Sequence, residues 1–278
     1  MIPVLAGLVA AILWGLSTVV ASRSTKLLGS QQALAWVMLI GLGVTLAAAP
    51  FAGTPRNVSA AGIGWALAAG LGSMLGLSMM YRALRIGKVG VVAPIASTEG
   101  ALAAVFSVAL GERLTADVAV CLAVIAAGVV VVTLHGETRD VHLRPSLYAV
   151  MAACSFGVGL VGSARAGVDL GALWTILAAR IIGVSGIAGP LLARRALPRP
   201  GRALWMVAFS ALAELIGFAA YIGGSRSGVA IPAVLASQFA AVAAVVGYAA
   251  FGERLAFRQR AGAAVILGGV AVLSLLRA

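Results

Sequence analysis

Long apolar runs, separated by short polar breaks, extend from one end of this chain to the other. The hydrocarbon core of a bilayer is crossed by about 20 apolar residues in a helix, so each run predicts a membrane-spanning helix. The first run has no Lys or Arg before it, which favours a span over a signal peptide. Ten runs fit this description, at residues 2–22, 32–51, 59–81, 89–110, 117–134, 145–165, 171–193, 203–222, 229–251 and 258–276. The predicted fold class is an all-α integral membrane protein.

The two halves of the chain carry matching features in the same order. Gly111-Glu112-Arg113-Leu114 reappears 141 residues later as Gly252-Glu253-Arg254-Leu255. Each half holds an odd number of spans, so the second half must enter the membrane upside down. The sequence therefore predicts two inverted five-helix repeats, residues 1–138 and 139–278, a layout common in secondary transporters. The other matches, 138 to 142 residues apart, are Pro94 to Ser97 with Pro232 to Ser237, Tyr81 with Tyr221, and Trp14-Gly15 with Phe156-Gly157.

The composition agrees with a membrane protein and argues against nucleic-acid binding, metal sites and disulfides. The chain is 62% hydrophobic and 10% charged, whereas soluble proteins carry about 25% charged residues. The net charge of +12 is scattered between apolar runs instead of forming a stripe, so we expect no nucleic-acid partner. Cys121, Cys154, His135 and His142 show neither metal-ligand nor disulfide spacing. We expect no metal and no cofactor.

Lys and Arg are distributed unevenly between the two sides of the predicted bundle. Alternate assignment of the loops gives fourteen on the side of the first loop and five on the other side. Cytoplasmic loops are enriched in Lys and Arg. The charge count therefore places both termini outside the cytoplasm.

Four short features follow one another along the predicted spans. They are Leu13-Trp14-Gly15, Tyr81-x-Ala83-Leu84, Pro94 and the Gly-Glu-Arg-Leu turn of each half. Together they resemble the EamA-type transporters of the drug/metabolite transporter superfamily, over essentially the whole chain. The resemblance implies a ten-helix carrier with a central cavity that exports or exchanges small metabolites, amino acids or drugs. It also implies cytoplasmic termini, but we follow the charge count, which points the opposite way.

Three charged residues, Glu99, Arg180 and Glu214, lie deep inside predicted spans. A charge at the bilayer centre costs about 2.5–3.5 kcal/mol on insertion scales, so such groups face the bundle interior and have partners. Two acids and one base cannot all pair. If Arg180 pairs with one glutamate, the other carboxylate is left for a proton or a substrate ammonium group. Alternatively, Arg180 binds a substrate carboxylate, or the ion pair is purely structural. Their repeat-related positions are uncharged, which is typical of a specialised site: Phe239 for Glu99, Met38 for Arg180 and Met74 for Glu214.

Polar and aromatic residues at helical spacing extend this candidate site. Ser210, Glu214, Gly217 and Tyr221 share one helical face, and Met74, Ser78 and Tyr81 share another. Trp14 lies well inside the first span, with Ser17 and Thr18 one turn further on; packing or interfacial anchoring is the alternative role for these aromatic residues. The predicted substrate-binding or coupling residues are Glu99, Arg180, Glu214, Trp14, Ser78, Tyr81, Ser210, Tyr221 and Gln238.

Two prolines and two acidic turns complete the prediction. Pro94 and Pro232 each remove a helical hydrogen bond and are candidate hinges, with a static kink as the alternative. Glu112 and Glu253 lie in turns, and we assign them to structure, either solvated or capping a helix start.

The function predicted from the sequence is secondary active transport in the inner (plasma) membrane. Small metabolites such as amino acids would be exported or exchanged by alternating access, and proton-coupled efflux of drugs or organic amines is the alternative. A passive channel and an intramembrane enzyme are the other classes, but no Ser/His, paired-Asp or HExxH motif supports an enzyme. The expected partners are a small-molecule substrate, protons and the lipid bilayer, with the chain acting as a monomer.

Overall fold

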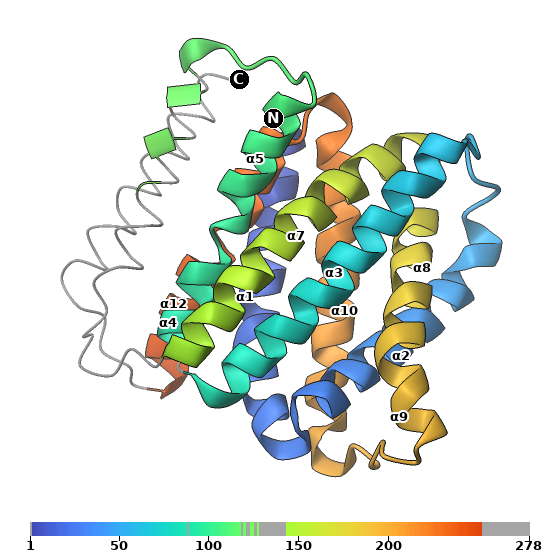
Figure 1. Ribbon diagram of the computed structural model, residues 1–278, viewed down its shortest axis with the longest axis vertical. Coiled ribbons are helices and arrows are strands. Elements are labelled where there is room, and N and C mark those ends of the chain that lie inside the picture. Colours follow the sequence, from blue (N-terminus) through green and yellow to red (C-terminus); the bar gives the residue numbers. More distant parts are fainter. Residues whose placement is uncertain are drawn as a thin grey trace.

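The computed structural model describes residues 2–87, 89–117, 119–120, 123–124, 127 and 143–251 of the 278 residues. Within them every regular element is helical, and the helices form one bundle (Figure 1). The longer helices are α1 (Ile2–Leu28), α2 (Ser30–Ala48), α3 (Ala60–Ile86), α7 (Leu143–Asp169) and α10 (Leu204–Gly224). The shorter ones are α4 (Val89–Ala96), α5 (Glu99–Ala109), α8 (Ala172–Gly183), α9 (Gly189–Ala193), α11 (Ala230–Ala236) and α12 (Phe239–Phe251).

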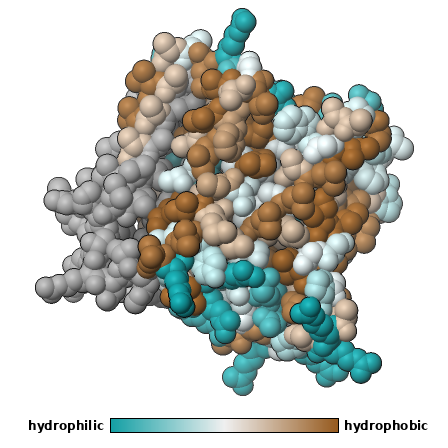
Figure 2. Space-filling view, viewed as in Figure 1, coloured by the Kyte–Doolittle hydropathy of each residue, from teal (hydrophilic) through white to brown (hydrophobic). Residues whose placement is uncertain are grey.

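Six helical stretches of the described residues are long and apolar enough to cross a membrane. Figure 2 shows apolar side chains over the middle of the molecule and hydrophilic ones gathered mainly at its lower end. The six stretches are Ile2–Leu28, Ser30–Phe51, Ala60–Ile86, Leu143–Asp169, Ala172–Ala193 and Gly201–Ser227. Most of the predicted span 117–134, the whole span 258–276, the second Gly-Glu-Arg-Leu turn and the boundary between the two predicted repeats lie outside the described residues.

The spans predicted at 89–110 and 229–251 are not continuous helices, which corrects the sequence-based assignment. The first is interrupted between α4 and α5 at Ser97-Thr98, and the second between α11 and α12 at Ser237-Gln238. Each interruption closes with a tight bond to the third residue back, Thr98 N to Ile95 O at 3.2 Å and Gln238 N to Leu235 O at 3.1 Å. The hydroxyls of Thr98 and Ser237 also donate to carbonyls three residues back, at 2.8 and 2.7 Å. Polar groups inside the bundle thus satisfy the backbone that the break exposes.

Other boundaries also differ from the prediction. Helices α1 and α3 continue to Leu28 and Ile86, beyond the predicted ends at 22 and 81. Lys and Arg are good helix formers whose alkyl stems extend the apolar surface, so a helix continues past the hydrocarbon core. The span predicted at 171–193 contains a π-helical segment, Val184–Ala188, between α8 and α9.

Helix α3 packs most extensively against α7, and α1 packs in the same way against α10. Glycines allow the backbones of α3 and α7 to touch: a Cβ placed on Gly72 would lie 2.6 Å from the backbone nitrogen of Gly159. Small residues are what close helix contact requires where lipid removes the hydrophobic driving force.

The two interrupted helices cross each other in reverse order. Helix α5 packs against α11, and α4 packs against α12. At the crossing a Cβ on Gly100 would lie 2.5 Å from the carbonyl oxygen of Ala233. Gly100 belongs to the row of small residues that also includes Ala96 and Ala104.

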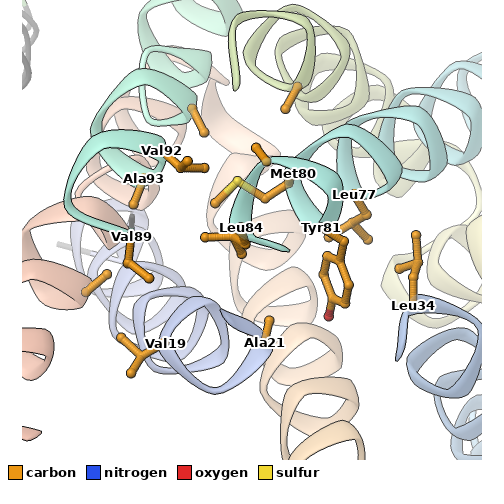
Figure 3. Close-up of a cluster of buried hydrophobic side chains, with 14 of the residues drawn as sticks. Val19, Ala21, Leu34, Leu77, Met80, Tyr81, Leu84, Val89, Val92 and Ala93 are labelled. Atoms are coloured by element: carbon orange, nitrogen blue, oxygen red, sulfur yellow. The ribbon is translucent and has the colours of Figure 1, made fainter. Parts of the chain in front are cut away.

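A cluster of buried apolar side chains joins α1, α2, α3 and α4, with further members on α7, α10 and α12, and Figure 3 shows part of it. Leu34, Leu84 and Val92 are fully buried within it. Tyr81 belongs to the same cluster and is 2% exposed, while Tyr221 is 0% exposed. Neither tyrosine is therefore an interfacial anchor, the alternative that their positions near helix ends had suggested.

Basic residues concentrate at one end of the bundle, which we call the basic end and which lies at the bottom of Figure 1. Nine described residues near its helix ends and loops are Arg23, Lys26, Arg82, Arg85, Arg144, Arg194, Arg195, Arg199 and Arg202. The opposite end holds four: Arg56, Arg113, Arg165 and Arg226.

Glu112 caps the start of α11 at the end opposite the basic end. Its Oε2 accepts from the Val229 amide at 2.9 Å, and its Oε1 accepts from the Ala230 amide at 3.2 Å. A carboxylate satisfies the unpaired amides of a helix start and complements its dipole. The structural assignment of Glu112 is thus confirmed, while Glu253 lies outside the described residues.

Replacement of Glu112 by Ala should lower the free energy of unfolding by about 1–2 kcal/mol, because two amides lose their acceptor. The loss can be measured by unfolding the purified protein in mixed micelles. Arg113→Ala, in the same turn, is the matched control and should change stability by less than about 0.5 kcal/mol. Equal effects of the two substitutions would contradict the capping role.

Candidate functional site

A partly open cavity lies between α1, α3, α5, α7, α10 and α12, with ≈ 600 Å³ of empty space when the open part is included, and we call it the central cavity. Two carboxylates, Glu99 and Glu214, line it. Ser17, Thr18 and Ser73 contribute hydroxyl groups. Half of the ten remaining lining residues are aromatic: Trp14, Tyr81, Phe156, Phe218 and Phe239.

Glu99 enters the central cavity from the interruption between α4 and α5, as the first residue of α5. It is 4% exposed. Within the described residues no ion pair and no hydrogen bond to its carboxylate is found; the ion pair of the interior involves the other glutamate. The start of a helix carries a partial positive charge, which stabilises a carboxylate there.

Arg180, Glu214 and Tyr81 form a buried group. Arg180 Nη1 lies 3.2 Å from Glu214 Oε2, and both side chains are about 95% buried. The Tyr81 hydroxyl donates to Glu214 Oε1 at 3.5 Å, and Arg180 Nη1 also contacts Met38 Sδ at 3.3 Å. Of the two pairings open to Arg180, the structure shows the one with Glu214, which leaves Glu99 without a basic partner among the residues that the structure describes.

A second pocket, with ≈ 360 Å³ of empty space, lies on the other side of this ion pair. Arg180 lines the second pocket, whereas Glu214 lines the central cavity; Ser73 and Phe218 line both. The second pocket reaches toward the end opposite the basic end, through Thr175 near the start of α8. The central cavity reaches toward the basic end through Leu84, near the end of α3. The ion pair, Ser73 and Phe218 thus form a layer between two spaces stacked along the bundle.

Trp14 contributes an indole to the central cavity. Its ring centroid lies 4.9 Å from that of Phe218 and 6.1 Å from that of Tyr221. The indole lies directly against Gly217, where no Cβ would fit. The Trp14 Nε1 group is buried and has no hydrogen-bond partner among the described residues. The indole therefore contributes an aromatic face to the wall, while its Nε1 group lies against Gly217 of α10.

Four of the predicted site residues lie outside both spaces. Ser78 accepts a hydrogen bond from Gln31 Nε2 at 3.1 Å, and the Tyr221 hydroxyl donates to the Leu160 carbonyl at 3.1 Å. Gln238 donates to the Val234 carbonyl at 2.9 Å, and Ser210 is fully buried. The structure thus brings Glu99, Glu214, Tyr81 and Trp14 together in one cavity, places Arg180 beside it, and puts these four residues in the packing around it.

The candidate hinges precede the helix interruptions. Pro94 lies in α4, before the Ser97-Thr98 interruption, and Pro232 lies in α11, before Ser237-Gln238. Pro232 is buried, and its backbone lies against Gly7 of α1.

Sequence reasoning missed the phenylalanines of the cavity wall. Two of them carried a signal, because Phe156 is the repeat counterpart of Trp14 and Phe239 is the counterpart of Glu99. Phe218 lies one helical turn after Glu214, on the same face. A search for residues related by the repeat to the charged and aromatic candidates would have found the first two.

Comparison with known proteins supports a membrane carrier. Residues 1–134 match the EamA-like transporter family, which belongs to the drug/metabolite transporter superfamily. No curated protein matches the chain. A solved crystal structure of a protein superimposes with a TM-score of 0.72 at 22% identity, over 99% of this chain and 96% of that one, which shows a shared fold. Over its first 134 residues this multi-pass membrane chain is similar to the EamA-like transporter family, and its apolar helices agree with that similarity.

Proposed function

We propose that the protein is a secondary active transporter that carries small organic solutes across the inner (plasma) membrane by alternating access. The observation that carries this proposal is that two pockets lie along the bundle with the Arg180–Glu214 pair, Ser73 and Phe218 between them. These side chains are the proposed barrier, which must open for a substrate to pass from the central cavity to the second pocket. A carrier needs such a barrier, whereas a passive channel needs a continuous path.

Ten spans in two inverted repeats are part of the proposal. Contacts mirrored between the halves support it: α1 packs on α10 as α7 packs on α3, and α1 meets α12 as α7 meets α5. A Cβ on Gly15 would lie 2.8 Å from the Phe239 carbonyl oxygen, and one on Gly157 would lie 3.5 Å from the Glu99 carbonyl oxygen. Gly15 and Gly157 are repeat partners, and so are Phe239 and Glu99. Such agreement is what a two-fold axis in the membrane plane produces.

The interrupted helices are the proposed moving parts. Because the regular helical ladder is already interrupted between α4 and α5 at Ser97-Thr98, and between α11 and α12 at Ser237-Gln238, each half-helix can tilt there at a smaller cost than within a continuous helix. Glu99 begins α5 and Phe239 begins α12, and both line the central cavity. Rearrangement of these helices would therefore reshape the site directly.

Orientation follows from the basic end, which we assign to the cytoplasm. The amino terminus lies at the opposite end (Figure 1). We propose from the Lys and Arg count that both termini lie outside the cytoplasm. The central cavity then extends toward the cytoplasmic side, which suits an exporter. Glu99 is the proposed coupling group, because one carboxylate binds either a proton or a positively charged substrate.

Flux through purified protein in liposomes tests the proposal. Uptake of labelled phenylalanine and labelled phenethylamine should be measured into vesicles that are empty or preloaded with the unlabelled compound. A carrier should give saturable uptake of at least one compound and at least about fivefold faster uptake into preloaded vesicles. The reason is that the loaded carrier returns with substrate bound.

Glu99→Gln should remove uptake driven by a pH gradient, and Asp169→Asn is its matched control. The Asp169 carboxylate bonds Ser59 far from the cavity, at 3.1 Å, so this variant should behave as wild type. Flux that never saturates and ignores preloading would indicate a channel and contradict the proposed function.

A further inference from the structure

The central cavity combines one carboxylate that has no counter-ion among the described residues with a wall that includes five aromatic side chains. We propose that it binds the positively charged group of a hydrophobic organic amine at Glu99, in preference to a zwitterion such as an amino acid. This inference rests on the proposed transport function and specifies the class of substrate.

The first argument is the charge balance of the interior. Glu214 already holds Arg180, through a contact of 3.2 Å between two side chains that are about 95% buried. Glu99 is equally buried, and no basic side chain of the described residues pairs with it. A buried charge is costly unless it is paired. One positive charge from a ligand would complete the balance.

The second argument is the position of Glu99 at the start of α5. A helix start contributes the equivalent of roughly half an elementary charge, which offsets part of the cost of burying a carboxylate but does not neutralise it. The interruption before α5 thus explains how an unpaired carboxylate is tolerated at this depth. It also leaves the carboxylate able to attract a cation.

The third argument concerns the kind of cation. Aromatic faces attract organic cations, and Trp is the strongest partner. The wall supplies Trp14 together with Phe156, Phe218 and Phe239. An inorganic ion would instead need several oxygen ligands, and no group of three or more His, Cys, Asp or Glu side chains occurs among the described residues. An amine with an apolar body matches both the charge and the wall.

The fourth argument is the place of Arg180. A zwitterion needs a positive group for its carboxylate, and Arg180 is the basic residue of the described interior. Its guanidinium lines the second pocket and not the central cavity, and its Nη1 is held by Glu214 and Met38. A substrate carboxylate placed in the cavity would meet Glu99 and Glu214 without a free cation, which disfavours it.

Three compounds that share one phenylethyl body test the proposal by calorimetry on the purified protein in detergent. They are phenethylamine, phenylalanine, which adds a carboxylate, and 2-phenylethanol, which lacks the charge. Phenethylamine should bind at least tenfold more tightly than either of the others. Glu99→Gln should weaken phenethylamine binding at least tenfold and leave 2-phenylethanol unchanged, which also reports that the cavity is intact. Asp169→Asn should bind all three as wild type does.

Phenylalanine binding as tightly as phenethylamine, no binding of phenethylamine to the wild-type protein, or unchanged binding to Glu99→Gln would each overturn the proposal. Failure of the transport function is seen separately. Counterflow of phenylalanine with no binding of phenethylamine would remove the amine preference and keep the carrier. Binding of phenethylamine without saturable flux of any compound would support the site and remove the carrier.

Discussion

Replacement of Arg180 by Met is expected to lower the free energy of unfolding by about 3–5 kcal/mol, because it leaves the Glu214 carboxylate buried without its cation. Tyr81 remains as a donor at 3.5 Å, and the helix start that stabilises Glu99 is not available to Glu214, which lies mid-way along α10. Unfolding of the purified variant in mixed micelles measures the loss. Flux should be lost as well, since the layer between the two spaces would no longer close in the same way.

The double variant Arg180→Met with Glu214→Met is the matched control. Removal of both charges takes away the desolvation cost together with the attraction, so most of the lost stability should return. A double-mutant cycle then gives the coupling energy between the two side chains. If the double variant is as unstable as the sum of the single variants, the pair does not act as a unit and the layer has another basis. If stability returns while flux remains absent, the pair serves transport.

Much of the fold could be predicted because a bilayer imposes a simple rule on the sequence. Runs of apolar residues near the length of a membrane span give the position of each helix, and Gly-rich rows indicate close contact. The interruption at Ser97-Thr98 was not predictable from that rule, because Ser and Thr are tolerated in helices and the flanking residues stay apolar. The signal for it was Pro94, which was interpreted as a kink. The break depends on the crossing with α11, where Gly100 meets Ala233, and that contact joins distant parts of the chain.

Residues whose burial in a membrane costs much free energy could be predicted as members of the candidate site, whereas residues whose burial costs little could not. Glu99, Arg180 and Glu214 stand out because a charge in an apolar run requires an explanation. Which glutamate would pair with Arg180 depends on how α8 and α10 face each other, and spacing within one helix does not contain that information. Ser210 shares a helical face with Glu214, but that face also packs against other helices away from the cavity. Helical spacing identifies residues on one face without saying what lies opposite each of them.

Replacement of Gly72 by Leu is expected to cost about 3 kcal/mol or more, because overpacking at a backbone contact forces helices apart. A Cβ on Gly72 would lie 2.6 Å from the Gly159 nitrogen and 2.7 Å from the Ser155 carbonyl oxygen, so neither neighbour can move alone. Helices α3 and α7 both line the central cavity, so their separation should also abolish flux. Stability in mixed micelles and elution as a single species in detergent measure the effect.

Gly64→Leu is the matched control on the same helix, since Gly64 is exposed and nothing lies within 4 Å of its Cβ position. That variant should keep wild-type stability, because its side chain enters lipid, and equal losses at both positions would show that the α3–α7 contact does not hold the bundle together.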